Sequence, residues 1–369
     1  MILHIDTGKT WRGGQQQAFY LHESLVSQKI PSLMICKKKS MMSVRCRENS
    51  LPFLNLPLSF EFDLRTVFLL VKYIKKYQAQ ILHLHDAHSL SIGLLAKLFY
   101  PRIRLIAVRR VDFTLHKSFL SFYKYHNNLL DCLVCISEKI GEIVLQDGIP
   151  KNKTRIIPSG INIKKYQFQN YQETLLCRQM LNDVYLIPKE NILVGTISAV
   201  VGHKDYPSLL KAAQIVLHKY TNITFIACGE GKQLQDMQVL HSQLQLGPNF
   251  IFTGFQDNII PFLKAFDIFV LSSKLEGLGT SVLNAMAAAK AIVACKSGGI
   301  PEMIRHEKNG LLAEKENPDD LAKKIMQLIA SPELREELAK QAAVDVENFS
   351  IENTVQQNIK LYQELGYEQ

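Results

Sequence analysis

The sequence lacks the features of a membrane-spanning or secreted chain. It has a single tryptophan among 369 residues, and no stretch approaches the ~18 consecutive apolar residues that a membrane-spanning helix needs. The N-terminus begins with the apolar run MILHID, without the basic segment and the small-residue cleavage site of a signal peptide, so we expect no signal peptide. Hydrophobic residues (47%) and charged residues (21%) instead indicate a globular chain, long enough for two domains.

Residue patterns that bind metals are also missing. The seven cysteines are scattered, and no group of cysteines and histidines has the spacing of a zinc site. Cys132 and Cys135 form one Cys-x-x-Cys pair, but it lies in an apolar, strand-like run, where two buried thiols are expected. No Asp-x-Asp pair is present to hold a divalent cation on a diphosphate. We therefore expect no metal, no cofactor and a cytoplasmic location.

Basic residues exceed acidic ones and are concentrated at the front of the chain. The net charge is +9; residues 1–60 contain eight Lys/Arg and three acids, whereas residues 331–369 contain three Lys/Arg and eight acids. This distribution suits an anionic partner, such as a phosphorylated substrate or an anionic membrane surface, although a solvated basic face has the same composition. No nucleic-acid-binding motif accompanies the charge, so no nucleic acid partner is expected.

Short apolar runs alternate with amphipathic stretches along the chain. Runs such as MILHID, ILHLH and IRLIAV have the length of buried strands, and the segments between them show the apolar spacing of helices. The pattern stops near Pro158 and Gly160 and restarts at NILVGTIS. Such alternation predicts parallel sheets with helices on both faces. We therefore predict an α/β fold with two doubly wound, Rossmann-like domains, residues 1–165 and 166–349, whose ligand-binding edges face each other across a cleft.

The stretch SSKLEGLGTSVLNAMA, residues 272–287, follows a predicted strand and opens a small-residue helix. Glycines in the turn let backbone N–H groups point toward a ligand, and the start of the helix adds further N–H donors for a phosphate. Glu276 is suited to accept hydrogen bonds from neutral hydroxyls. Phosphate donors beside a hydroxyl acceptor predict a nucleotide-sugar site, and the alternative is a tight turn with a capped helix. The expected donor-binding residues here are Gly277, Leu278, Gly279, Thr280 and Asn284.

Three further loops follow predicted strands. Lys204 lies between a strand and a helix, where its ammonium would neutralise a diphosphate, although a surface lysine is the alternative. Gly13 and Gly14 open a helix after the first strand and offer backbone donors, or form a plain turn. Gly229 and Gly254 would let a nucleotide approach the backbone of the second domain, with structural turns as the alternative.

Polar residues end two other strands of the first half. His83 and His85 share one face of the strand in ILHLHDAHS. Three roles stay open for them: metal ligands, an acid–base group, or polar residues at a sheet edge. Arg109 and Arg110 end the strand in IRLIAVRR, and one of them is expected to face an anionic group. The candidate catalytic residues are Glu276, Lys204, His85 and Arg109.

In this order, the stretches resemble glycosyltransferase family 4, of the retaining, two-domain GT-B type. The resemblance covers nearly the whole chain, in residues 136–162, 194–213, 225–233, 252–304 and 309–325, and the block from FTGF to SGGIPE is its most specific part. The WRGGQ and EGLGTSVL stretches are similar to one bacterial subgroup.

The resemblance implies that the second domain binds a nucleotide-sugar donor without a metal. Glu276 matches the first acid of the family's Glu-x7-Glu motif, whose second acid is replaced by Asn284, and Lys204 matches the phosphate-binding lysine. An arginine that the family often carries corresponds to Thr196 and is missing here. The resemblance also implies that the last helix, residues 350–369, packs back on the first domain.

With the basic first domain, the resemblance suggests a glycan or lipid-linked acceptor, such as a lipopolysaccharide intermediate, and peripheral contact with the anionic inner face of the cell membrane. Three alternatives stay open from the sequence. They are a nucleotide-sugar epimerase of the same fold, a non-catalytic sugar-nucleotide-binding protein, and a basic module that binds nucleic acid or membranes.

Overall fold

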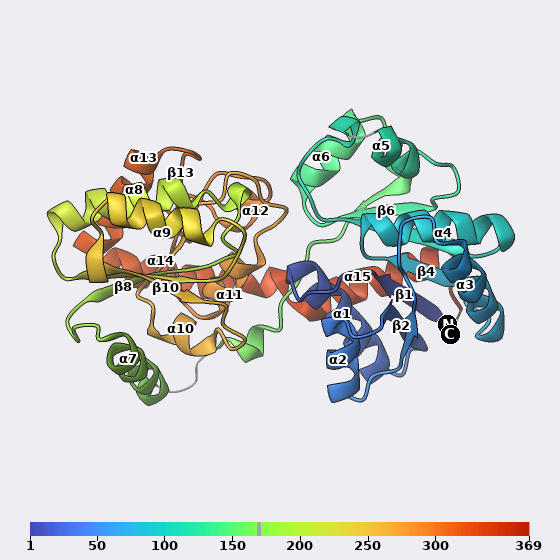
Figure 1. Cartoon of the computed structure of the whole chain (residues 1–369), viewed down its shortest axis with the longest axis horizontal. Coiled ribbons are helices and arrows are strands. Elements are labelled where there is room, and N and C mark those ends of the chain that lie inside the picture. Colours follow the sequence, from blue (N-terminus) through green and yellow to red (C-terminus); the bar gives the residue numbers. More distant parts are fainter. Residues whose placement is uncertain (118, 168–170, 369) are drawn as a thin grey trace. The chain divides into compact units, whose positions relative to one another are not determined.

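The chain forms two compact α/β units (Figure 1). The structure, a computed structural model, describes residues 1–117, 119–167 and 171–368. Unit 1 contains Met1–Gly160 together with the chain from Ile351 onward, and unit 2 contains Ile161–Ser350. The division falls at Gly160 rather than at residue 165, because the Ile161 N–H donates to the carbonyl of Phe349 (3.0 Å) and ties this segment to unit 2.

Unit 1 is built on a seven-stranded parallel sheet in the order β3-β2-β1-β4-β5-β6-β7. Its central strands are mostly apolar, and all five residues of β1 are buried, as expected for a parallel sheet covered on both faces. The strands are β1 (Ile2–Asp6), β2 (Ser32–Lys37), β3 (Phe53–Leu56), β4 (Ile81–Leu84), β5 (Arg104–Arg109), β6 (Cys132–Cys135) and β7 (Thr154–Ile156).

The C-terminal helix belongs to unit 1 and packs against α1. Tyr362 of this helix is fully buried, and its hydroxyl lies 2.7 Å from Nδ1 of His83 on β4. On β6, burial raises the pKa of both cysteine thiols, Cys132 and Cys135, to about 12. The helices are α1 (Gly13–Ser27), α2 (Met41–Glu48), α3 (Leu64–Lys76), α4 (Ala87–Phe99), α5 (Phe119–Tyr125), α6 (Glu138–Gln146) and α15 (Ile351–Glu364).

Unit 2 repeats the architecture with a six-stranded parallel sheet in the order β10-β9-β8-β11-β12-β13. The strands are β8 (Ile192–Ile197), β9 (Ile223–Cys228), β10 (Phe250–Gly254), β11 (Ile268–Leu271), β12 (Ala291–Cys295) and β13 (Leu311–Ala313). The helices are α7 (Tyr171–Tyr185), α8 (Tyr206–Lys219), α9 (Leu234–Gln243), α10 (Ile260–Ala265), α11 (Thr280–Ala287), α12 (Ile300–Met303), α13 (Pro318–Ala330) and α14 (Pro332–Asp345).

Each sheet has one point at which the strand order reverses. In unit 1 the chain builds outward from β1 to β3 and then returns to the other side of β1 with β4; in unit 2 it does the same with β8 and β11. The loops that follow these two central strands diverge to opposite faces, and ligands of doubly wound sheets bind in the crevice between them. The predicted fold class, two doubly wound Rossmann-like sheets, is confirmed.

Three strands and three helices (α2, α6 and α7) escaped the sequence analysis. The strands β3, β7 and β13 all lie at sheet edges, where a strand of three or four residues needs no long apolar run. The helices α2 and α7 were not foreseen because their apolar spacing is weak. Among the residues that the structure describes, no helix has both the length and the apolarity to cross a membrane.

Candidate active site

The switch point of unit 2 brings Lys204 and Glu276 together. Lys204 ends a 3-10 turn, Gly202–Lys204, that follows β8, and Glu276 lies in the loop after β11. The Lys204 ammonium and the Glu276 carboxylate form an ion pair, although 72 residues separate them in the sequence. Their side chains are 15% and 13% exposed, so the pair is mostly desolvated but still reaches the surface. An anionic ligand that arrives here can take the ammonium from the carboxylate.

Backbone contacts hold the two loops in this position. The Ser272 hydroxyl donates to the carbonyl of Lys204 (2.8 Å), and the Lys274 N–H donates to the carbonyl of His203 (2.9 Å). The Gly299 N–H donates to the carbonyl of Gly277 (3.2 Å), which joins the loop after β12 to the same turn. These contacts fix the two loops relative to each other independently of the ion pair.

The turn from Gly277 to Thr280 leads directly into α11. Gly279 has a φ of +91°, and a Cβ added there would lie 2.6 Å from Cδ1 of Ile300, so the position requires glycine. No side chain caps the start of α11; the Val282 N–H donates to the carbonyl of Gly279 (2.9 Å), so the N–H groups that precede it are the ones an anion would meet. Leu278 is buried in the core, so only its backbone can contact a ligand.

Buried polar atoms without a partner gather near this turn. Asn284, on the second turn of α11, is buried, and its Oδ1 has no hydrogen-bond partner among the described residues; the same holds for the hydroxyls of Ser273 and Ser297. A buried polar group without a partner costs free energy. Hydroxyl groups of a bound ligand would give the Asn284 acceptor its missing donor.

The glycine loops after β9 and β10 serve the fold itself. A Cβ on Gly229 would lie 1.9 Å from the carbonyl oxygen of Ser198, and the Gly229 N–H donates to the carbonyl of Gly254 (2.8 Å). Gly254 has a φ of +72°. Close packing and a tight turn thus account for both glycines, which favours the structural alternative for these loops.

The switch point of unit 1 carries the start of α1 and the start of α4. No side chain caps α1, whose first residues are Gly13 and Gly14. Asp86 caps α4 and also accepts hydrogen bonds from the N–H (2.7 Å) and the hydroxyl (2.9 Å) of Thr7, which follows β1. The Asp86 carboxylate is therefore occupied with holding the two loops together.

Three buried imidazoles lie below this edge. His4 of β1 is the register partner of His83 of β4, and Nδ1 of His4 lies 2.9 Å from Nε2 of His85. Burial lowers the pKa of His83 to about 3 and the pKa of His4 and His85 well below the usual value, so all three rings are neutral near pH 7.

Ligand nitrogens of these rings are near enough to one another for a metal ion. However, the His4–His85 hydrogen bond occupies one nitrogen of each ring, and the rings of His83 and His85 stack at 4.5 Å with an angle of 23°. In-plane lone pairs of stacked rings do not converge on one point. The arrangement therefore fits a hydrogen-bonded core better than a metal centre.

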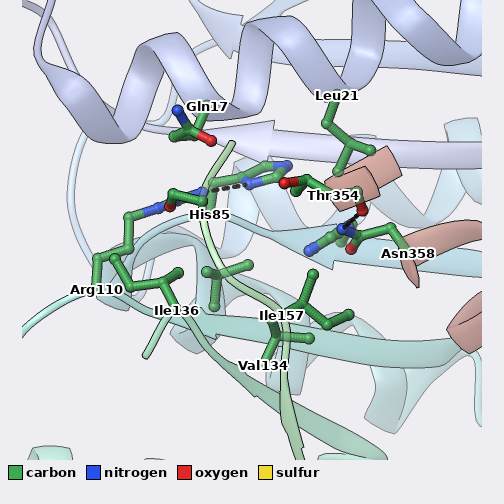
Figure 2. Close-up of a pocket in the computed structure, with 12 residues that line it drawn as sticks. Gln17, Leu21, His85, Arg110, Val134, Ile136, Ile157, Thr354 and Asn358 are labelled. Atoms are coloured by element: carbon green, nitrogen blue, oxygen red, sulfur yellow. Dashed lines mark hydrogen bonds between the residues drawn. The ribbon is translucent and has the colours of Figure 1, made fainter. Parts of the chain in front are cut away.

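A small cavity of about 30 Å³ lies between these rings, α1 and α15 (Figure 2). Figure 2 shows Gln17 and Arg110 toward one end of the lining residues and Asn358 of α15 toward the other. Nη2 of Arg110 lies 3.5 Å from Nδ1 of His85. Burial lowers the pKa of Arg110 to about 10, an effect that nearby Asp6 and Asp86 oppose. Most of the surface that lines the cavity is apolar, although polar side chains contribute to it, and the cavity has room for about one or two water molecules.

Two family models match the chain. The model described as Glycosyltransferase Family 4 matches residues 11–165, and the model described as Glycosyl transferases group 1 matches residues 178–345. The chain belongs to the GT-B glycosyltransferases.

Relatives and solved structures agree with this assignment. The glycosyltransferase is 30% identical over 243 residues to the N,N'-diacetylbacillosaminyl-diphospho-undecaprenol alpha-1,3-N-acetylgalactosaminyltransferase of Campylobacter jejuni (66% of this chain, 62% of that enzyme). It is 22% identical over 349 residues to the UDP-Gal:alpha-D-GlcNAc-diphosphoundecaprenol alpha-1,3-galactosyltransferase of Escherichia coli (89% and 87%). Its fold matches HepE of Anabaena, solved in complex with UDP-glucose, with a TM-score of 0.86, 20% identity and coverage of 98% and 99%.

Two residues selected from the sequence of this glycosyltransferase lie in its core. His85 is buried and hydrogen-bonded to His4, so it is not a solvent-facing acid–base group. Arg109 is also buried; its guanidinium donates to the carbonyl of Phe113 and lies 5.3 Å from the ring centroid of Tyr125. Of the two arginines, Arg110 rather than Arg109 therefore lines the cavity.

Sequence analysis also missed residues of the glycosyltransferase that the fold brings to this edge. His4 joins the histidine cluster, and Asp6, whose pKa burial raises to about 6, accepts hydrogen bonds from Gly8 and Gln15. Both residues are polar positions on one face of the otherwise apolar strand β1. That alternation was the only available signal.

Proposed function

We propose that this glycosyltransferase transfers a sugar, with retention of the anomeric configuration, from a nucleoside-diphosphate sugar to a hydroxyl of a lipid-linked glycan acceptor. In this reaction the bond between the anomeric carbon and the diphosphate oxygen breaks, and a bond from the anomeric carbon to the acceptor oxygen forms. The nucleoside diphosphate and a proton are released. The observation that carries the proposal is the Lys204–Glu276 ion pair beside the uncapped start of α11.

Charge on the leaving diphosphate is the main electrostatic burden of the reaction. The Lys204 ammonium and the N–H groups between Gly277 and Thr280 would bind the diphosphate and stabilise the negative charge as the bond breaks. Because these donors supply the positive charge, the proposed reaction needs no metal ion. When the diphosphate takes Lys204, the Glu276 carboxylate becomes available to hydroxyls of the transferred sugar.

The nucleoside would lie against Asn284. Its buried Oδ1 is suited to accept a hydrogen bond from a ribose hydroxyl, as a neutral amide without the charge assistance of a carboxylate. HepE, whose fold this chain shares, was solved with UDP-glucose, and the Escherichia coli relative is named as a UDP-galactose enzyme. These names support a uridine nucleotide as the donor.

The acceptor is proposed from the relatives and from the charge of the chain. Both named relatives act on sugars linked to diphospho-undecaprenol. The basic front of the chain, with eight Lys/Arg and three acids in residues 1–60, suits such an anionic acceptor. We therefore propose a role in cell-envelope glycan synthesis, at the inner face of the membrane.

A thermal-shift panel of UDP, GDP, ADP and UDP-sugars tests the donor. We expect UDP and one UDP-sugar to raise the melting temperature, because a ligand that binds only the folded state stabilises it by mass action. The Lys204→Ala variant should lose this shift, whereas Lys211→Ala, which changes an exposed lysine on α8 of the same unit, should keep it. An unchanged shift in Lys204→Ala would remove Lys204 from the donor site.

Product analysis tests the reaction itself. We expect mass spectrometry to detect a sugar added to a short-chain undecaprenyl-diphosphate-linked acceptor, and NMR to report the same anomeric configuration in donor and product. NMR of the UDP-sugar incubated without an acceptor separates transfer from epimerisation. An altered sugar nucleotide in that sample would contradict the proposal.

A further inference from the structure

A large set of apolar side chains is exposed on α3, α4, α5 and the segment before α3. Several are aromatic, and the most exposed of them, Phe119, is 82% exposed. We call this set the α3–α5 surface; its members are Phe60, Phe62, Leu64, Phe68, Leu98, Phe99, Phe119, Leu120 and Tyr123. Isolated exposed apolar residues are normal, but a cluster of this kind marks an interaction site.

Contacts between the elements make the α3–α5 surface continuous. The rings of Phe68 on α3 and Phe99 on α4 lie 5.1 Å apart. Glu61 accepts a hydrogen bond from the Ser91 hydroxyl (2.8 Å) and forms an ion pair with Lys124 of α5. Lys124 also donates to the carbonyl at the start of α4 (3.1 Å). The segment before α3 is thus fastened to both other helices, which Figure 1 shows in the same unit.

Cations accompany the apolar side chains on α3, and the acid named above, Glu61, is paired with Lys124. The sequence of α3 contains four cations, Arg65, Lys72, Lys75 and Lys76, and no acid, and all four are exposed. Helical spacing puts Lys72 and Lys75 on the face that also carries Leu64 and Phe68. The outer face of α3 is therefore apolar at its N-terminal end and cationic at its C-terminal end.

We propose that the α3–α5 surface docks unit 1 onto a lipid bilayer with anionic headgroups. Apolar side chains would enter the boundary between headgroups and acyl chains, while the lysines of α3 contact lipid phosphates. The proposal rests on the proposed function, because a lipid-linked acceptor requires the enzyme to work at a membrane. It adds the residues of this chain that make the contact.

A second copy of the chain is a poorer occupant. In a symmetric dimer the same patch of each copy faces the other. The cations of α3 would then lie against the cations of the second copy, or the two patches would be offset and leave apolar residues uncovered. The exposed apolar stripe of α7 in unit 2, which includes Leu176, Met180 and Val184, has no such cations; its exposed charged neighbours are Glu173 and Asp183. That stripe does not suit an anionic bilayer and supplies a control.

Vesicle co-sedimentation tests the proposal without donor or acceptor, so its outcome does not depend on catalysis. We expect the full chain to sediment with vesicles of phosphatidylglycerol and phosphatidylcholine, and at least about ten-fold less with phosphatidylcholine alone. Changing Lys72, Lys75 and Lys76 together to Gln should weaken this binding about 100-fold, at about five-fold for each cation. The Phe60→Ser/Phe68→Ser double variant should weaken it at least about ten-fold.

Matched variants in unit 2 control for lost charge and lost hydrophobicity. The triple change of Lys308, Lys315 and Lys323 to Gln alters the net charge equally, and Leu176→Ser/Val184→Ser removes two equally exposed apolar groups. Both should sediment as the parent chain does. All variants should keep the UDP thermal shift, which reports that unit 2 is folded and that donor binding is intact.

Two outcomes would overturn the proposal. One is that the parent chain stays in the supernatant with phosphatidylglycerol vesicles. This includes the case in which the chain is a dimer that the Phe60→Ser/Phe68→Ser change dissociates. The other is loss of binding by the unit 2 controls as large as that of the α3 variants. Either result leaves the donor experiments untouched, whereas failed transfer with normal vesicle binding would count against the proposed function alone.

Discussion

The two switch points have the same topology but use their polar residues differently. At the edge of unit 2, Lys204 and Glu276 pair with each other across two loops, and the amides at the start of α11 have no capping side chain. At the edge of unit 1, Asp86 caps a helix and His85 is bonded to His4, below the surface. A position at the end of a central strand therefore does not by itself make a residue functional. What matters is whether its polar atoms can exchange their partner in the protein for a ligand.

Desolvation explains part of this difference. In unit 1 the imidazoles are deeply buried and neutral, and each finds a hydrogen-bond partner inside the unit. In unit 2 the charges of the ion pair persist because each balances the other, and a diphosphate can replace the carboxylate as the partner of Lys204. Unit 1 thus uses its switch point mainly to hold the fold, whereas unit 2 keeps at its own an ion pair that the proposed donor would exchange.

The largest expected effect is a loss of activity on changing the edge of unit 2, which a change at the edge of unit 1 should not cause. Glu276→Gln should lower kcat about 10²- to 10³-fold, because the transferred sugar loses its charged acceptor, and should also lower the melting temperature, because the Lys204 ammonium loses its partner. Steady-state kinetics and thermal unfolding measure the two quantities, with Glu333→Gln on α14 as the control for loss of a surface carboxylate.

His85→Asn is the counterpart in unit 1. It should lower the free energy of unfolding by about 1–3 kcal/mol, because it takes the partner from a buried ring nitrogen of His4. The kcat of the folded fraction should change only a few-fold. A His85→Asn enzyme of normal stability that has lost its activity would break the comparison.

Backbone strain in the donor turn comes next. Gly279→Ala should destabilise the protein by about 2–3 kcal/mol and remove the UDP thermal shift, because the added Cβ meets Ile300 at a left-handed backbone position. Gly247→Ala is the matched control, since Gly247 also has a positive φ (+55°) but open space around its Cβ. It should cost only about 1 kcal/mol. Equal losses in the two variants would show that strain alone, and not the packing of the donor turn, accounts for the effect.

Acidification should affect unit 1 before unit 2. The folded-state pKa values of His22 and His83 are lowered to about 4 and about 3, so below pH 6.5 the unfolded chain binds more protons than the folded one. Stability therefore falls as the pH falls, by up to about 2 kcal/mol per histidine between pH 6.5 and 5. Asp6 opposes this in part, because its pKa is raised to about 6 and it takes up a proton in the folded state.

Hydrogen exchange followed by mass spectrometry at pH 7 and pH 5 resolves the two units. After correction for the intrinsic exchange rate, we expect protection to fall in β1, β4 and α15 and to persist in β8 and β11. Uniform loss of protection in both units would contradict the assignment of the acid sensitivity to the histidine cluster.

The smallest effect concerns the C-terminal helix. Tyr362→Phe removes the hydroxyl that bonds to Nδ1 of His83 and should cost about 1 kcal/mol of unfolding free energy, measured by urea denaturation. Tyr123→Phe, at an exposed tyrosine on α5, should cost nothing measurable. A Tyr362→Phe protein as stable as the parent would show that the hydrogen bond between α15 and β4 contributes little to unit 1.

Sequence reasoning identified the long central strands more readily than the edges. β1, β4, β8 and β11 are apolar runs buried on both faces, so their sequences carry a strong signal. Edge strands such as β3 and β13 are three or four residues long and have one unpaired side, so their sequences look like loops. The helix α7 was missed for a similar reason, because much of its apolar surface is exposed rather than periodic toward a core.

The site residues also divide into those with a local sequence signal and those without one. The turn from Glu276 to Thr280 could be recognised because glycines between a strand and a helix have a local physical meaning. The partnership of His4 with His85, and the burial of Arg109 where Arg110 lines the cavity, depend on strands that are far apart in the sequence. No local pattern distinguishes two adjacent arginines whose side chains point to opposite faces.

By itself, the sequence determined the alternation of strands and helices, the parallel character of both sheets and the loops in which glycine, lysine and glutamate could meet a ligand. Hydrophobic periodicity and turn chemistry are local properties, so they can be read from neighbouring residues. Only the tertiary structure decided that β1 lies beside β4 and β8 beside β11, and hence which side chains meet. Strand adjacency depends on non-local crossover connections, and whether a polar group stays available depends on the partners that those connections bring to it.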